Sequence, residues 1–190
     1  MIVLASRSPR RRQLLEMLGI PHLVDPADVD ERQQPGEAPE AFAARIARTK
    51  ALHVAPRHGA TPVLGADTVV VVNGATLGKP ASPDEAARML ALLQGREHRV
   101  VTAVALAAAG RVHERCDVTR VWFRRLSPDQ IRAYVATGEP LDKAGAYGVQ
   151  GVGSVLVERV DGDFFGVMGL PLRLVVDVLE SAGIPYAFTR

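Results

Sequence analysis

One acidic residue stands inside the most apolar stretch of the chain. Residues 62–72 are apolar or small, except for Asp67 and its neighbour Thr68. An ionised carboxylate in such surroundings has a large desolvation cost, so it persists where it is paired, hydrogen-bonded or bound to a metal. Gly65, two positions earlier, indicates that another part of the chain approaches closely. Asp67 is therefore the sharpest candidate for chemistry, with a strand aspartate satisfied by backbone N–H groups as the alternative.

A basic stretch lies at the expected start of the first helix. It contains Arg7, Arg10, Arg11 and Arg12. Ser8 suits the N-cap position and Pro9 the first helical position. Cations are unfavourable at the positive end of a helix dipole unless an anion joins them, so the pattern favours a phosphate site. A solvated surface run and a basic arm for nucleic acid remain open alternatives.

Carboxylates gather in a polar segment over residues 25–39. They are Asp25, Asp28, Asp30 and Glu31. Glu31, together with Asp67, could supply oxygen ligands to a hard cation such as Mg²⁺, which takes a few carboxylates besides substrate phosphates. A solvated acidic loop is the alternative.

Two isolated lysines are further candidates for anion binding. Lys50 lies in an expected helix, and Lys79 lies between Gly78 and Pro80, at the end of the hairpin that begins with Asp67. Ordinary exposed lysines are the alternative interpretation.

A glycine-rich segment covers residues 142–153. Its glycines are Gly145, Gly148, Gly151 and Gly153. The spacing matches neither the P-loop nor the dinucleotide fingerprint. The segment could let backbone approach a ligand while Gln150 reads a base edge, or it could be a set of bends between a helix and a strand.

Composition narrows the class of protein. The 190 residues are 47% hydrophobic and 23% charged with a net charge of +2, which is typical of one globular domain and too weakly basic to argue for nucleic-acid binding. Cys116 is the sole cysteine, so no intramolecular disulfide forms. No signal peptide is visible, and no apolar run approaches the roughly 18 residues of a membrane span. Neither the H-E-x-x-H nor the G-x-S-x-G motif is present.

Alternating apolar segments and turn signals predict the elements that position these residues. Ser82, with Glu85 completing a capping box, and Ser127 should start two further helices. Asn73-Gly74 predicts a hairpin turn, and residues 154–160 and 164–168 should pair as another hairpin. Strands are expected at 1–5, 20–24, 62–72, 75–77, 99–107, 111–123, 154–160 and 164–168, and helices at 9–18, 40–55, 83–94, 128–137 and 170–182. The mixture predicts an α/β fold with a mixed sheet.

Seven ordered motifs carry a resemblance that covers nearly the whole chain. They are Ser6-Arg7-Ser8-Pro9-Arg10-Arg11, residues 45–50, Gly65-Ala66-Asp67-Thr68-Val69, Gly78-Lys79-Pro80, residues 98–104, residues 138–151 and Gly169-Leu170-Pro171-Leu172. In this order they resemble the Maf family of nucleoside triphosphate pyrophosphatases. The departures are Arg7, where glycine is frequent, and Phe165-Gly166-Val167-Met168, which replaces a more usual Asn-Val-Val.

The resemblance implies a fold, an activity and a setting. The fold would be similar to that of inosine triphosphate pyrophosphatases, an elongated mixed sheet with flanking helices in two lobes around a cleft, here as one domain over residues 1–190. The activity would be cleavage of a nucleoside triphosphate to the monophosphate and pyrophosphate, with a divalent cation, Mg²⁺ or Mn²⁺. The setting would be a cytoplasmic homodimer without nucleic-acid or membrane partners.

The resemblance also implies residue roles. Asp67 would accept the proton from water and, with Glu31, lie near the metal. The triphosphate-binding positions would be Ser6, Arg10, Arg11, Lys50 and Lys79. Substrate choice would depend on Arg10, Thr68 and Gln150, whose forms here resemble the branch acting on dTTP and UTP. The alternatives are the same reaction on another nucleotide, such as 7-methyl-GTP, and a non-catalytic regulator that binds nucleotides or nucleic acid.

Overall fold

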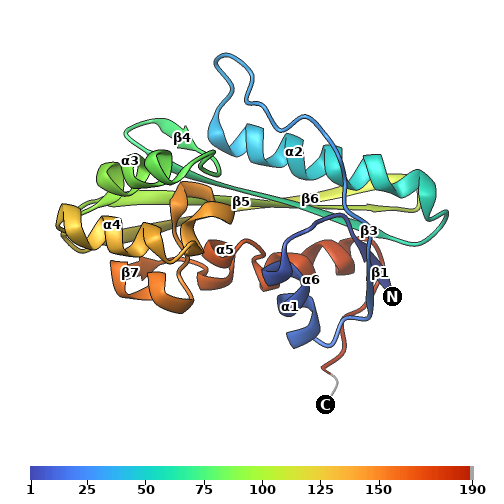
Figure 1. Cartoon of the computed structure of the whole chain (residues 1–190). Helices are drawn as coiled ribbons and strands as arrows, with labels where there is room; N and C mark the ends of the chain where they lie inside the picture. The colour runs from blue at the N-terminus through green and yellow to red at the C-terminus, as the bar shows by residue number, and fades with distance from the viewer. Residues whose placement is uncertain (189–190) are drawn as a thin grey trace. The chain divides into compact units, whose positions relative to one another are not determined.

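The computed structural model describes residues 1–188, within which seven strands form one mixed sheet (Figure 1). The strand order is β2-β1-β3-β5-β6-β7, and β4 pairs with β3. β1 runs parallel to both β2 and β3, whereas β4 and β7 run antiparallel to their partners β3 and β6. The strands are β1 (Ile2–Leu4), β2 (His22–Val24), β3 (Val63–Val72), β4 (Ala75–Leu77), β5 (Glu97–Ala108), β6 (Arg111–Phe123) and β7 (Val157–Asp161). The expected mixed α/β class is confirmed.

Helices connect most of these strands. They are α1 (Pro9–Met17), α2 (Pro39–Val54), α3 (Pro83–Leu93), α4 (Pro128–Ala136), α5 (Phe164–Met168) and α6 (Leu172–Ser181). Short 3₁₀ turns are η1 (Ala55–Arg57), η2 (Glu139–Asp142), η3 (Ala144–Ala146) and η4 (Gly151–Leu156). None of the helices described over residues 1–188 combines the length and apolar character needed to cross a membrane.

The three expected Ser-Pro helix starts are confirmed, with one difference in detail. Ser8, Ser82 and Ser127 each accept a hydrogen bond from the N–H three residues later. At α4 the Gln130 side chain completes the capping box. At α3 the Glu85 carboxylate instead accepts from the Ala81 N–H at 2.7 Å. The predicted box at Ser82 is therefore wrong in its second half, although the helix N-terminus is satisfied in both cases.

The chain divides into two compact units. The first contains residues 1–67, 102–117 and 169–190, and the second contains residues 68–101 and 118–168. In the first unit a small apolar cluster joins Val3 of β1 and Ala5, which follows that strand, to Val54 and Val63. In the second unit a larger cluster gathers around Leu90, Leu93, Phe123 and Tyr147. The extent of one domain over residues 1–190 stays a prediction.

The expected hairpin between residues 154–160 and 164–168 is wrong. Only its first segment becomes a strand, β7, which pairs with β6 in a register that places Val121 opposite Val160. The second segment is the short helix α5, because Asp163 acts at its start: its carboxylate accepts the Gly166 N–H at 3.0 Å and its carbonyl accepts the Val167 N–H. The Asp163 N–H donates in turn to Thr119 Oγ1 at 2.7 Å.

His98 is a buried ionisable residue in the core of the second unit. Its side chain is 2% exposed and its Nε2 lies 2.8 Å from the hydroxyl of Tyr147. Phe123 packs edge-on against both rings. Burial lowers the pKa of His98 from 6.5 to about 4. The neutral imidazole is therefore the form that the folded protein accommodates.

The depressed pKa predicts a loss of stability in mild acid. Below pH 6.5 the unfolded chain binds a proton at His98 that the folded chain does not bind until about pH 4. The free energy of unfolding should fall by about 2 kcal/mol between pH 7 and pH 4.5 from this residue. Urea denaturation at both pH values, compared with His98→Phe, measures the contribution. Equal acid losses in the two proteins would contradict the assignment.

Candidate active site

The site in the first unit depends on a close approach between α2 and β3. A Cβ added at Gly65 of β3 would lie 2.2 Å from the Ala47 carbonyl oxygen and 2.8 Å from the Ala51 N. Both alanines are fully buried. The close neighbour expected from Gly65 is therefore the backbone of α2, and only glycine at position 65 allows this distance.

This packing brings Lys50 of α2 to Asp67 of β3. Lys50 Nζ lies 2.8 Å from Asp67 Oδ1, and each residue is 7% exposed. The question of how a carboxylate survives in an apolar strand is thus answered by a buried ion pair rather than by backbone N–H groups. Burial raises the pKa of Asp67 above its usual value, and the charges of Lys50 and Arg11 oppose that rise. The carboxyl is consequently easier to protonate than an exposed aspartate, which suits a base that must accept a proton.

Glu31 joins the same lysine from the acidic loop. Its Oε1 lies 2.9 Å from Lys50 Nζ, so two carboxylates converge on one cationic group. The arrangement brings together both residues proposed for metal binding. Two carboxylates beside a substrate phosphate form a donor set that Mg²⁺ accepts. Among the described residues, no larger cluster of His, Cys, Asp and Glu suited to a metal is found.

Arg11 turns inward from the start of α1. Its Nε donates to the Gly169 carbonyl at 2.8 Å, and its Nη1 donates to the Ala66 carbonyl at 2.9 Å and to Ser6 Oγ at 3.2 Å. Burial lowers the pKa of Arg11, although the nearby carboxylates Asp67 and Glu31 oppose the shift. Arg11 thereby ties the end of β1 to the residue before Asp67 and to the segment before α6.

Ser6 lies at the centre of this corner. Its Oγ accepts hydrogen bonds from Arg11 Nη1 and from the Ser8 N–H, both at 3.2 Å. Because the two acceptor positions of the hydroxyl are used, its O–H is left to act as a donor. A donor hydroxyl at a helix N-terminus suits a phosphate oxygen.

The arginine run therefore divides by role. Arg11 binds backbone carbonyls, and Arg12 pairs with Glu16 at 3.3 Å on its own helix. Arg7 is exposed and Arg10 is half-buried at the first turn of α1. The sequence analysis did not distinguish these four arginines. In the structure Arg11 is buried, Arg12 pairs on the helix surface, and Arg7 and Arg10 lie at or just before the start of α1.

Arg45 holds the loop that carries Glu31, a role that the sequence analysis did not identify. Arg45 Nε and Nη2 bind the two carboxylate oxygens of Glu37 at 2.6 and 2.7 Å, and Nη2 also donates to the Arg32 carbonyl at 3.0 Å. Glu37 accepts the Gln34 N–H as well, at 3.0 Å. This clamp is bidentate, and hydrogen bonding to Arg45 lowers the pKa of Glu37 to about 2.

The remaining predicted site residues belong to the second unit. Thr68 is half-buried on β3, Lys79 is exposed between β4 and α3, and Gln150 is exposed immediately before η4. The predicted site residues that belong to the first unit are Ser6, Arg10, Arg11, Glu31, Lys50 and Asp67.

The buried ion pair predicts a stability effect. Lys50→Met keeps an unbranched side chain but leaves Asp67 buried without its cation, which should lower the free energy of unfolding by about 3 kcal/mol. Urea denaturation at pH 7 measures the loss. The double variant Lys50→Met with Asp67→Asn should recover part of it, because the uncompensated charge is then gone. A double variant as unstable as the single one would contradict the pairing argument.

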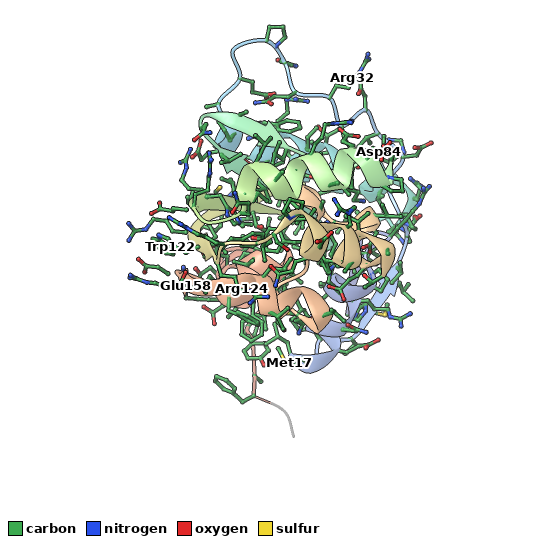
Figure 2. The ribbon with its side chains drawn as sticks, turned by 60° about the vertical axis from the view of Figure 1, so that its left-hand side comes forward. Met17, Arg32, Asp84, Trp122, Arg124 and Glu158 are labelled. Carbon is green, nitrogen blue, oxygen red and sulfur yellow. The ribbon has the colours of Figure 1, made fainter. Side chains whose placement is uncertain are left out.

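The Arg45 clamp predicts the protease resistance of the acidic loop. Arg32 projects from this loop with an 88% exposed side chain, so trypsin can reach it (Figure 2). Arg45→Ala releases the Arg32 carbonyl and Glu37 and should speed cleavage after Arg32 by on the order of tenfold. Arg48→Ala on the same helix removes an equally bidentate pair with Glu114 outside the loop and is the matched control. Equal cleavage rates in the two variants would show that the clamp does not order the loop.

Comparison with known proteins bears directly on this arrangement. A protein from Moorella thermoacetica, named dTTP/UTP pyrophosphatase, is 52% identical over 188 residues, which cover 96% of this chain and 95% of the relative. Proteins of the same name from Syntrophomonas wolfei and Myxococcus xanthus are 48% and 52% identical and cover 95% and 97% of this chain, and 96% and 94% of their own. The profile of the Maf-like protein family matches residues 1–182. The chain therefore belongs to the Maf family.

Proposed function

We propose that this protein is a nucleoside triphosphate pyrophosphatase that hydrolyses dTTP and UTP to the monophosphate and pyrophosphate. The observation that carries the proposal is the buried Asp67 carboxylate paired with Lys50, at a corner of polar groups by the N-terminus of α1. The shared name of relatives that are about half identical over nearly their full length supports the choice of nucleotides.

In the proposed reaction Asp67 activates water. The carboxylate takes a proton from a water molecule whose oxygen attacks the α-phosphorus, and the bond from that phosphorus to the bridging oxygen breaks to release pyrophosphate. Lys50 binds Oδ1, so the second carboxylate oxygen is the one that accepts the proton. Burial raises the pKa of Asp67 and so supplies the basicity, while the charge of Lys50 opposes that rise.

Cationic and donor groups would hold the triphosphate. The hydroxyl of Ser6 and the first turn of α1, with Arg10, offer donors and positive charge to phosphate oxygens. Arg11 acts mainly by holding this corner together, since its guanidinium binds the Gly169 and Ala66 carbonyls. Lys50 and Lys79 are the further triphosphate-binding positions that the family resemblance implies.

The carboxylates of Asp67 and Glu31 would hold a divalent cation, Mg²⁺ or Mn²⁺. Their convergence on one ammonium group supports this assignment, because the position already favours a cation. When bound, the cation supplies charge neutralisation to the phosphate oxygens and the leaving pyrophosphate. The Arg45 clamp serves this part of the site by holding the loop of Glu31.

Substrate choice and setting are proposed on the same family basis. Arg10, Thr68 and Gln150 would discriminate among nucleotides, with the amide of Gln150 able to donate and accept at a base edge. The protein would act as a cytoplasmic homodimer without nucleic-acid or membrane partners.

The substitution Asp67→Asn tests the proposed chemistry. Turnover of dTTP and UTP with Mg²⁺ should fall by on the order of a thousandfold, as expected for loss of a general base. Pyrophosphate release is the assay, and the thermal transition checks that the variant is folded. Asp84→Asn, at an exposed carboxylate on α3, is the matched control and should retain full activity (Figure 2).

Other outcomes would redirect the assignment. Orthophosphate as the first product would place the cleavage at a different phosphoanhydride bond. A wild-type protein that hydrolyses 7-methyl-GTP in preference to dTTP and UTP would change the substrate but retain Asp67 as the base. A protein without turnover that binds nucleic acid, with an affinity falling steeply with salt, would favour the non-catalytic alternative.

A further inference from the structure

A single carboxylate organises the glycine loop, which we define as residues 148–153. Glu139, at the start of η2, accepts the Gly153 N–H at Oε1 and the Val152 N–H at Oε2, at 2.9 and 3.0 Å. The hydroxyl of Tyr134 donates to the same Oε1 at 2.9 Å. The carboxylate therefore binds one side of the loop through two successive backbone N–H groups.

Tyr134 binds the other side of the loop. Its hydroxyl oxygen accepts the Gly148 N–H at 3.1 Å, and its side chain is anchored in the core of the second unit with 5% exposure. Tyr134 and Glu139 lie at the end of α4 and just after it, in the same unit as the loop. The loop is thus held at Gly148 and at Val152-Gly153, on both sides of Gln150.

The glycines of the loop are explained by the groups that it encloses. A Cβ at Gly153 would lie 2.4 Å from the Tyr134 hydroxyl and 2.9 Å from Glu139 Oε1. A Cβ at Gly151 would lie 2.9 Å from Glu139 Oε2, and Gly151 also has φ +71°. A Cβ at Gly148 would lie 3.2 Å from Oε1. At Gly151 and Gly153 the loop lies so close to Glu139 that a Cβ would force the carboxylate to shift, whereas at Gly148 the contact is merely tight.

Gln150 is exposed and lies between the bound positions of this loop, as do Gly151 and, at its edge, the exposed Val152. Gly148, two residues before it, is hydrogen-bonded to Tyr134, and Val152, two residues after it, is hydrogen-bonded to Glu139. The backbone of Gln150 itself is extended, with φ −106° and ψ 166°. Burial alone would raise the pKa of Glu139, but the hydrogen bonds from Tyr134, Gly153 and Val152 outweigh burial and lower it. Glu139 is therefore ionised at neutral pH, and its hydrogen bonds to the loop are charge-assisted.

We infer that Glu139, supported by Tyr134, is a positioning residue for substrate selection: it fixes the backbone on both sides of Gln150 so that the amide meets the base in one orientation. The inference rests on the proposed function, since it assigns the geometry through which Gln150 discriminates. An amide that rotates freely can turn either its C=O or its NH₂ group toward a base edge, so it pairs with different bases. An amide held in one orientation binds poorly to a base that leaves its C=O or NH₂ group without a hydrogen-bond partner.

The substitution Glu139→Gln tests this inference. The amide presents an NH₂ group to a backbone N–H that formerly donated to an oxygen, so at least one loop contact is lost. The ratio of kcat/KM for UTP to that for CTP should fall about tenfold, mainly through a higher KM for UTP, as expected for loss of one oriented hydrogen bond. Asp129→Asn, at an exposed carboxylate of α4 paired with Arg132 on that helix, is the matched control and should leave the ratio unchanged.

Two further measurements distinguish a role of Glu139 in positioning Gln150 from a general loss of structure in the variant. Hydrogen exchange should show that the amides of Gly148, Val152 and Gly153 are protected in the wild type, and that those of Val152 and Gly153, which Glu139 binds, lose protection in Glu139→Gln. Within a Gln150→Ala background, Glu139→Gln should leave the UTP/CTP ratio unchanged, because the residue that it positions is gone. If Glu139→Gln does not fold, Tyr134→Phe is the milder variant, since it releases only the Gly148 N–H from the loop.

The outcomes distinguish failure of this inference from failure of the proposed function. A wild-type protein that hydrolyses no nucleoside triphosphate overturns both, and that result appears before any variant is compared. A wild-type protein that prefers UTP, with variants that lose loop protection and keep the preference, overturns the positioning role alone. An effect of Glu139→Gln that persists in full in the Gln150→Ala background also overturns it.

Discussion

The buried pair of Lys50 and Asp67 is the constraint around which the first unit is arranged. A carboxylate at this depth requires a cation at hydrogen-bond distance, and the nearest helix must deliver it. Delivery at 2.8 Å depends on the backbone of α2 packing against β3, and this close approach requires glycine at position 65. The rest of β3 is also apolar and buried apart from Thr68, and Val70 and Val72 belong to the core cluster of the second unit.

The same pair sets a balance between stability and reactivity. A fully compensated carboxylate would be a poor base, and an uncompensated one would bind a proton and lose its charge. Burial raises the pKa of Asp67 while Lys50 and Arg11 oppose the rise, so burial and the two cations act on its basicity in opposite directions. Lys50 also binds Glu31, and an arriving phosphate or metal would compete for these contacts. Ligand binding and the basicity of Asp67 are thus coupled through one ammonium group.

Local signals in the sequence predicted most elements, and long-range contacts account for the errors. Ser-Pro helix starts and the Asn73-Gly74 turn depend on atoms within three or four residues, so they can be predicted from the local sequence. The misassigned α5 depends on Asp163, whose N–H is bound by Thr119, 44 residues away. Likewise, nothing near the arginine run indicates which guanidinium turns inward, because the carbonyls that select Arg11 lie 55 and 158 residues away.

The glycines show why residue type alone could not locate every functional group. Spacing drew attention to Gly148, Gly151 and Gly153 as a backbone that could approach a ligand, but the close neighbours are an internal carboxylate and phenol. The glycines correctly indicated that other atoms lie close to the backbone, but they did not identify those atoms. The same is true of Gly65. Since an enclosed carboxylate restricts the backbone more firmly than solvent would, the glycines that make the loop look flexible in the sequence make it rigid in the fold. A residue exposed on such a loop presents its side chain from a fixed base, which is the property that selection between similar ligands requires.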